Sequence, residues 1–280
     1  MKYHIEKNTV QETLVIPLYA RKMCSELFPS LFRDETAIRL IDEIDYDFSG
    51  LAEKAGSATR RFGFLEVAMR QNDLAYEVRE YLKEHPEAAV VNLGCGLDDT
   101  GRRCDNGQCH IYNLDFPDVI SVRNELLPAG EREENIACDL NDTSWFDKID
   151  GSNGAIFFAA GVFYYFLSEQ VKKLVRKMAK AFPGGRLVFD AANRAAVKLM
   201  LKTWIKDAEI RDVGAYFAVS DAGHEISTWS PGIQVSSRGY MLGYNDLRDP
   251  SVSGFFRFLA RVGDGVMKMR IVRVEFGDSN

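Results

Sequence analysis

Long apolar runs and blocks of like charge are both missing from this chain of 280 residues. No stretch reaches the roughly 18 consecutive apolar residues that a membrane-spanning helix needs, and the N-terminus lacks the charged and then apolar pattern of a secretory signal. Lys and Arg number 35 against 41 Asp and Glu, a formal net charge of -6, whereas nucleic-acid-binding proteins usually carry a basic face. We therefore expect a cytoplasmic protein with neither a membrane nor a nucleic-acid partner.

Cysteine is scarce, with five residues scattered over the whole chain. An odd number at wide spacing does not form a disulfide framework. Cys104 and Cys109, followed by His110, are the one cluster that suggests a metal. Structural zinc normally needs four ligands in paired short spacings, and no second pair is present. We therefore expect free thiols and no metal site.

Internal repeats and linkers rich in Pro, Gly or Ser are missing as well, which predicts a single domain. We expect residues 1–85 to form an N-terminal helical cap of this domain and residues 86–280 to form its core. The clearest helical pattern in the cap is the stripe Leu74, Val78, Tyr81 and Leu82, with Pro86 just beyond its expected end. Weaker helical patterns cover residues 21–27, 36–44 and 63–69.

In the core, short apolar segments alternate with polar or helical stretches, which predicts βαβ units and a parallel sheet. One helix is clear: Ser168 is the expected N-cap, and Pro183 follows its end. Its buried stripe comprises Val171, Leu174, Val175, Met178 and Phe182. The expected strands are Val90–Leu93, Gln108–Leu114, Asn135–Cys138, Ala155–Ala160 and Arg186–Phe189.

The end of the chain departs from this alternation. Gln234–Tyr244 and Met267–Phe276 are strand-like, and Phe255–Ala260 between them leaves no room for a long crossover helix, so we expect an antiparallel pair. The predicted fold class is α/β, a mostly parallel sheet with a terminal antiparallel strand. This arrangement is typical of Rossmann-like S-adenosylmethionine-dependent methyltransferases, although a fold alone does not fix function.

A glycine turn and an acid stand at the ends of the first two expected strands. Gly94 and Gly96 let the backbone approach a ligand closely, and Asp115 lies 19 residues after Gly96. In doubly wound sheets an acid at this place can accept hydrogen bonds from both ribose hydroxyls. Asp139, at the end of the third strand, is equally explained as an adenine contact, with Leu140 packing on the ring, or as a turn residue.

A nucleotide-cofactor oxidoreductase is the competing interpretation of this pattern. Its fingerprint needs a third glycine three residues after the second, where this chain has Asp99. An acid there would repel a pyrophosphate, whereas S-adenosylmethionine carries an amine, a carboxylate and a sulfonium. The pattern therefore favours the methyl donor as cofactor.

Specific motifs resemble the leucine carboxyl methyltransferase family, and within it the bacterial branch that includes tetracenomycin-type polyketide O-methyltransferases. The resemblance covers most of the chain up to about Asn193. The motifs are Val90–Asp98 with Asp115–Ile120, Thr13–Ala20, Ile44–Phe48 and Gly161–Phe166.

The resemblance implies roles for matching residues. Arg70 would hold the donor's carboxylate, although by itself it would be taken for a surface helix charge. Gly94 and Gly96 would form the donor loop, Asp115 would bind the ribose, and Asp139 with Leu140 would contact the adenine. The cap would close over the sheet as a lid.

Two features of this site depart from the family pattern. The segment Gly96–Arg103 carries extra residues after the donor loop, and Ala160 stands where the eukaryotic branch has an acid. A catalytically silent donor-binding protein is therefore a further alternative.

The expected reaction is O-methylation of a small molecule, with a polyketide or other secondary-metabolite acid as the leading acceptor. A carboxylate is already ionised near neutral pH and needs no general base. A phenol would want one, for which His4, His110 and His224 are the candidates. Tyr164 and Tyr165 either line the methyl-transfer pocket, through cation–π contact with the sulfonium, or pack in the core. The sequence leaves the oligomeric state open.

Overall fold

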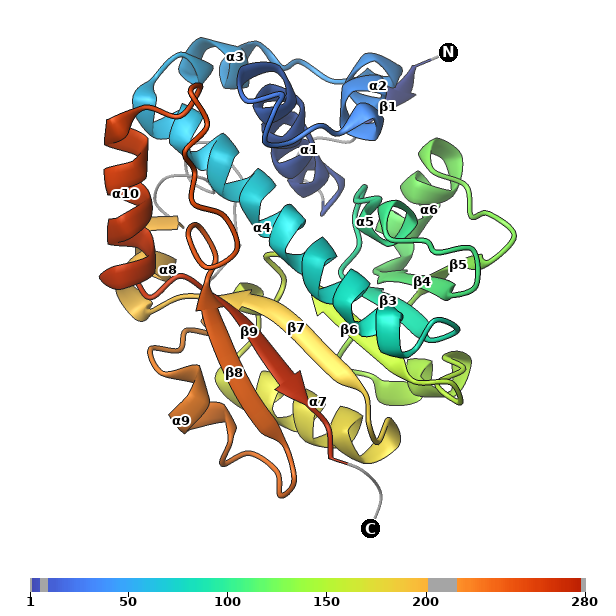
Figure 1. The fold of residues 1–280 in the computed structure, drawn as a ribbon. Helices are drawn as coiled ribbons and strands as arrows, with labels where there is room; N and C mark the ends of the chain where they lie inside the picture. The colour runs from blue at the N-terminus through green and yellow to red at the C-terminus, as the bar shows by residue number, and fades with distance from the viewer. Residues whose placement is uncertain (1, 6–9, 201–215, 278–280) are drawn as a thin grey trace.

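The computed structural model describes residues 2–5, 10–200 and 216–277, and its centre is a sheet of seven strands (Figure 1). The strand order is β5-β4-β3-β6-β7-β9-β8. The strands are β3 (Ala89–Leu93), β4 (His110–Asp115), β5 (Glu133–Ala137), β6 (Ala155–Ala159), β7 (Arg186–Ala191), β8 (Gln234–Gly239) and β9 (Arg270–Glu275).

Strands β3 to β7 run parallel, and β9 pairs antiparallel with both β7 and β8. Strand β8 therefore points the same way as the first five, and β9 is the one reversed strand of this sheet. The predicted mostly parallel sheet and antiparallel pair are confirmed. The structure adds that the reversed strand lies inside the sheet, with β8 at its edge.

The central strands are apolar on both faces because helices cover both. All five residues of β3 and of β6 are buried, as expected for parallel strands between two helical layers. Val90, Ile156 and Val188 belong to the core beneath α4 (Ala58–Glu84), whereas Phe157 and Leu187 pack beneath α7 (Ser168–Ala181).

Helix α4 crosses one face of the sheet in the direction opposite to the parallel strands (Figure 1). Near its C-terminal end, the Tyr81 hydroxyl accepts from the N–H of Ala155 at 3.2 Å, at the start of β6. Near its middle, Arg70 reaches Asp190 close to the end of β7. The first turns of α4 therefore extend beyond the carboxyl ends of the strands. The predicted helical segments at 63–69 and 74–82 are parts of this one helix.

Three further helices of the cap lie above these carboxyl ends (Figure 1). The Arg21 side chain of the first donates to Asp34, whose carboxylate also caps the second by accepting from the N–H of Ala37 at 2.7 Å. They are α1 (Val10–Leu27), α2 (Glu35–Glu43) and α3 (Ser49–Ala55), with the short strands β1 (Tyr3–His4) and β2 (Ile44–Asp45) beside them.

Shorter helices connect the strands of the core. Ser168 was predicted to be the N-cap of α7, but it is the first residue of the helix. The N-cap is Leu167, whose N–H donates to the Gln170 side chain at 2.8 Å. The connecting helices are α5 (Thr100–Arg103), α6 (Pro117–Leu126), η1 (Thr143–Lys148), η2 (Phe163–Tyr165), α8 (Arg194–Met200), α9 (Ala222–Ile226) and α10 (Gly254–Gly265).

One expected boundary at the end of the chain is wrong, and the structure adds a helix there that was not predicted. Strand β8 ends at Gly239, before the predicted Tyr244, because the Asp264 carboxylate accepts from the N–H groups of Met241 and Leu242 and turns the chain away. The connection to β9 also holds a helix of 12 residues, α10, capped by Ser253. An antiparallel pair does not need a crossover helix, so the pairing alone gave no sign of it.

None of the helices in the described ranges combines the length and apolar character required to cross a membrane.

One acid on α4 is buried without an ion pair to any described residue. Asp73 accepts from the Asn245 side chain through Oδ1 at 3.2 Å, while its Oδ2 has no partner in the described part of the chain. Burial, and then the nearby Asp264 and Glu77 carboxylates, raise the pKa of Asp73 to about 9. An unfolded chain titrates this group near ~4. Folding therefore takes up a proton between these two values, and stability should fall as pH rises through that window.

We expect Asp73→Asn to remove this pH-dependent loss, because the amide keeps the Asn245 contact and cannot ionise. Urea unfolding at pH 5 and pH 8 measures the effect: the variant should gain stability relative to wild type at pH 8 and less at pH 5. The same substitution at the exposed Asp118 is the control. An equal difference at both pH values would show that Asp73 stays ionised in the folded protein.

Candidate functional site

The turn after β3 requires glycine because of its backbone conformation and because neighbouring side chains pack closely against it. Gly94 and Gly96 have φ angles of 66° and 48°, in the left-handed region that favours glycine. A Cβ on Gly94 would lie 2.6 Å from Cγ2 of Val162, and one on Gly96 would lie 3.1 Å from Cδ2 of Leu14. The turn is thus held between the segment after β6 and helix α1.

Asp115 closes this turn from the end of β4. Its Oδ2 accepts from the N–H of Gly96 and its Oδ1 from the N–H of Phe116, both at 2.8 Å. Burial raises the pKa of Asp115, although these two donors oppose the shift. A carboxylate has about four lone-pair positions, so two remain for ligand hydroxyls. The predicted spacing of glycine and acid is therefore realised as direct contact.

Two buried arginines that the sequence analysis missed fix the carbonyl groups of the same loop. Arg123 on α6 donates to the carbonyls of Gly96 at 2.9 Å and Asp98 at 2.7 Å. Arg21 on α1 donates to the carbonyl of Leu97 at 2.8 Å. The signal for Arg123 was present, because it falls within the apolar stripe of Val119, Val122 and Leu126.

The extra residues after the donor loop include α5, and their charged side chains pair with other residues of the chain. Asp99 pairs with Arg103 at 3.0 Å, and Arg102 pairs with Glu133 at 2.6 Å. Asp98 accepts from the Thr100 N–H at 3.0 Å. The contacts of these extra residues therefore stabilise the donor loop without replacing the Gly94–Gly96 turn.

Asp139 and Leu140 follow the carboxyl end of β5, beside the end of β4, since the N–H of Cys138 donates to the Asp115 carbonyl at 2.8 Å. Asp139 is exposed, and its Oδ1 accepts from the Asn141 N–H at 2.9 Å. Leu140 is buried among core side chains. Asp139 is thus a turn residue, and an adenine contact for either residue stays a prediction.

The Arg70 side chain is only 14% exposed, so Arg70 is not the surface charge that its position alone suggested. Its Nη1 lies 3.0 Å from Oδ2 of Asp190, whose Oδ1 accepts from the Gly161 N–H at 2.6 Å. A Cβ on Gly161 would lie 2.7 Å from Arg70 Nη1. Burial alone would lower the pKa of Arg70, but Asp190, Tyr240 and Tyr164 raise it above its usual value. Arg70 is therefore a fixed cation, and its Nε has no hydrogen-bond partner among the residues that the structure describes.

The two adjacent tyrosines after β6 have different surroundings. Tyr164 is buried, and burial followed by Asp190 and Tyr240 keeps its pKa well above the usual range. Tyr165 is 46% exposed. Tyr164 thus belongs to the Arg70 cluster as a neutral phenol, whereas Tyr165 is open to solvent.

Sequence reasoning missed Asp190, although the signal was the one used for Asp115: an acid at the end of a strand. It also missed Glu66 and Tyr240, which approach Arg70 from α4 and from the segment after β8. For Glu66 the helical spacing to Arg70 was readable, but nothing marked that face as buried.

His110 and the cysteine pair lie elsewhere, whereas His224 lies on α9 beside Asp221. His110 begins β4, at the opposite edge of the sheet, and pairs with Glu134 at 3.3 Å. Cys104 and Cys109 are buried free thiols. Within the described ranges no three His, Cys, Asp or Glu side chains are grouped to hold a metal.

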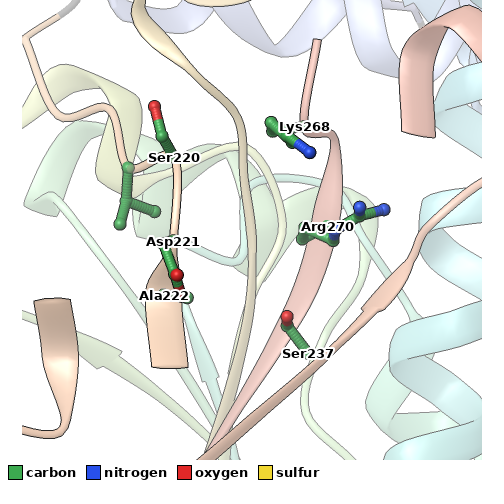
Figure 2. Close-up of a pocket in the computed structure, with 7 residues that line it drawn as sticks. Ser220, Asp221, Ala222, Ser237, Lys268 and Arg270 are labelled. Carbon is green, nitrogen blue, oxygen red and sulfur yellow. The ribbon is translucent and has the colours of Figure 1, made fainter. Parts of the chain in front are cut away.

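A cavity of about 330 Å³ lies on the other face of the sheet, near the carboxyl end of β7 (Figure 2). Ser220 and Asp221 lie on one side of it, and Lys268 and Arg270 lie on the other, with Ser237 of β8 below. The wall that carries Ser220 is joined to the Arg70 side of the sheet, because the Tyr216 N–H bonds the Tyr164 carbonyl at 2.7 Å.

Comparisons with known proteins agree with this architecture. The leucine carboxyl methyltransferase family model matches residues 15–179. The tetracenomycin polyketide synthesis O-methyltransferase TcmP of Streptomyces glaucescens is 30% identical over 183 residues, which are 65% of this chain and 66% of TcmP. The match thus spans just under two thirds of that relative.

Solved structures show a similar fold at low identity. A DUF574 family protein from Streptomyces avermitilis is 12% identical with a TM-score of 0.59, over 92% of this chain and 96% of its own. The plantazolicin methyltransferase BpumL, solved with S-adenosylhomocysteine, is 13% identical with a TM-score of 0.50, over 96% of this chain and 100% of its own. These likenesses confirm the predicted Rossmann-like fold.

We expect Arg70→Met to lower the free energy of unfolding by roughly 3–5 kcal/mol, because it leaves the Asp190 carboxylate buried without its cation. The double variant Arg70→Met with Asp190→Asn should recover part of this loss. Urea unfolding of both single variants and the double variant gives the coupling. The exposed Arg79→Met on the same helix is the control, with an expected change within about 0.5 kcal/mol. Additive effects would show that the pair does not hold α4 to β7.

Proposed function

Because the chain belongs to the leucine carboxyl methyltransferase family, we propose that it transfers a methyl group from S-adenosylmethionine to a carboxylate oxygen of a small molecule. The observation that carries this proposal is the set of residues gathered at the carboxyl ends of the strands. There the glycine turn, Asp115 and the fixed cation Arg70 stand at the ends of three strands, β3, β4 and β7, as the donor of such an enzyme requires.

The residues present fit the donor. Asp115 keeps two free lone-pair positions for the ribose hydroxyls. Arg70 keeps an unpartnered Nε and further N–H donors beyond the one given to Asp190, and a guanidinium has five donors in all. These can hold the donor's carboxylate in a charge-assisted contact. The structure of BpumL with S-adenosylhomocysteine supports this class of ligand. In this proposal Asp139 and Leu140 face the adenine.

The chemistry asks little of the protein beyond alignment. Bound S-adenosylmethionine supplies an electrophilic methyl group on its sulfonium, and displacement in line by an oxygen gains chiefly from proximity and orientation. A carboxylate acceptor arrives ionised, so no general base is needed. Tyr164 stays protonated beside Asp190 and positions the Arg70 cluster, whereas the exposed Tyr165 faces the space where sulfonium and acceptor meet.

The cavity in Figure 2 favours an acidic acceptor. Lys268 and Arg270 bring two cations to a site of about 330 Å³. Among its described lining residues Asp221 is the one acid, and it already caps α9 by accepting from the His224 N–H. A volume near the lower end of small-molecule pockets suits a compact acid. The name of TcmP supports a polyketide or related secondary-metabolite acid. Residues 1–85 would close over the donor site as a lid. The cytoplasmic location stays a prediction.

The first measurement is calorimetric titration with S-adenosylmethionine and S-adenosylhomocysteine, with NADH as the control for an oxidoreductase. We expect micromolar binding of both sulfur ligands and none of NADH. Asp115→Ala should weaken binding by about tenfold or more, since it removes hydrogen bonds to a charged group. Asp118→Ala, an exposed acid three residues away, should bind as wild type does. A folded protein that binds neither sulfur ligand would exclude the donor site.

The acceptor class is tested by a screen of aromatic and aliphatic acids against their amides and against phenols without a carboxyl group, with transfer of labelled methyl as the readout. We expect transfer only to the acids, as base-labile methyl esters. Stable methyl ethers of phenols would exclude the carboxylate proposal and leave the methyltransferase assignment intact. Donor binding without transfer to any acceptor would favour the catalytically silent alternative.

A further inference from the structure

Glu66 stands one helical turn before Arg70 on α4, further from the sheet and closer to the cap. Residues four apart share one face of a helix, with Cβ atoms about 5–6 Å apart. The groups that act on its carboxyl come from three elements: Arg70 on α4, Asp264 on α10, and Tyr240 after β8. Glu66 therefore belongs to the same charged cluster as the Arg70–Asp190 pair.

The charges in this cluster do not balance. The Arg70 cation is already matched by Asp190 at 3.0 Å. Tyr164 and Tyr240 are buried phenols whose pKa values lie well above the usual range, so they carry no charge. The Asp264 oxygens accept from the N–H groups of Met241 and Leu242. The Glu66 carboxylate is the one of these three that has neither a cation nor an N–H donor within hydrogen-bonding distance among the described residues.

Glu66 is half-buried, yet it has no hydrogen bond or ion pair to any residue of the described ranges. Its pKa is raised to about 7, first by burial; Arg70 opposes this shift and Asp264 adds to it. Withdrawing a carboxylate from water without a partner is unfavourable. A cation placed beside Glu66 would relieve that cost and restore its ionised form.

We propose that Glu66 recognises the α-ammonium group of the donor while Arg70 holds the donor's carboxylate. This inference rests on the proposed function, which places the amino-acid end of S-adenosylmethionine at Arg70. That end carries one anion and one cation, and the two side chains on successive turns of one helix carry the complementary charges. S-adenosylhomocysteine has the same amino-acid end, whereas 5′-methylthioadenosine lacks it.

Binding should then be linked to proton release. Glu66 is about half protonated in the free protein at pH 7, and the bound ammonium ion favours the carboxylate. S-adenosylhomocysteine should therefore release about half a proton per site at pH 7. Because protons compete with the cation, affinity should fall as pH drops below 7 and level off above it.

The experiment is calorimetric titration of S-adenosylhomocysteine at pH 7 in phosphate and in Tris, whose different ionisation heats report the proton count. Wild type is compared with Glu66→Gln, and with Glu84→Gln at an exposed position of α4 as the matched control. We expect Glu66→Gln to bind about tenfold or more weakly, with the released proton lost and the pH dependence between 6 and 8 flattened. Binding of 5′-methylthioadenosine should be the same in all three proteins.

Each arm decides something different. If wild type binds S-adenosylhomocysteine but Glu66→Gln keeps the same affinity and proton release, the role of Glu66 is overturned and the proposed function stands. An equal loss for 5′-methylthioadenosine also overturns it, because the effect would then come from the fold of the site. If wild type binds no sulfur ligand, the proposed function itself fails. Thermal unfolding of Glu66→Gln checks that the variant is folded, which we expect because it removes an unmatched charge.

Discussion

The ion pair between Arg70 and Asp190 is the contact on which the site depends. It joins the middle of α4 to the end of β7, and Asp190 reaches on to the Gly161 N–H after β6. One buried carboxylate thus fixes the helix, a strand and a turn relative to one another. A buried pair is a poor source of net stability, but breaking it is costly. Its consequence here is geometric, because it fixes the position of α4, and with it the rest of the cap, relative to the ends of the strands.

The donor loop is held by the same kind of device. Arg123 and Arg21 direct their guanidinium groups at three successive parts of the loop, the carbonyls of Gly96, Leu97 and Asp98. The Asp115 carboxylate accepts a hydrogen bond from the Gly96 N–H of the same loop. Rigid placement of this kind serves a reaction that gains from alignment more than from acid–base chemistry. The inserted residues of α5 do not interfere with these contacts, because they form ion pairs with other residues, Asp99 and Glu133.

Charges of both signs lie along α4. Glu66, Asp73 and Glu77 share one face of the helix with Arg70, and the Glu77 carboxylate lies 3.5 Å from Nη1 of Arg273 on β9. Across the sheet, Lys268 and Arg270 line the cavity. The chain as a whole has a net charge of -6, so local placement decides which of these charges find a partner.

The sequence by itself determined the strands, the parallel sheet, the glycine turn and its distance to Asp115. These rest on local patterns: apolar runs buried on both faces, residues that need a left-handed backbone, and the position of strand ends. It did not reveal α10, the continuity of α4, or the pairing of Arg70 with Asp190, 120 residues apart. Only the tertiary structure decided those, because the burial of a charge depends on which distant segment packs against it. A helix charge such as Arg70 or Glu66 has the same local pattern whether it faces solvent or the site.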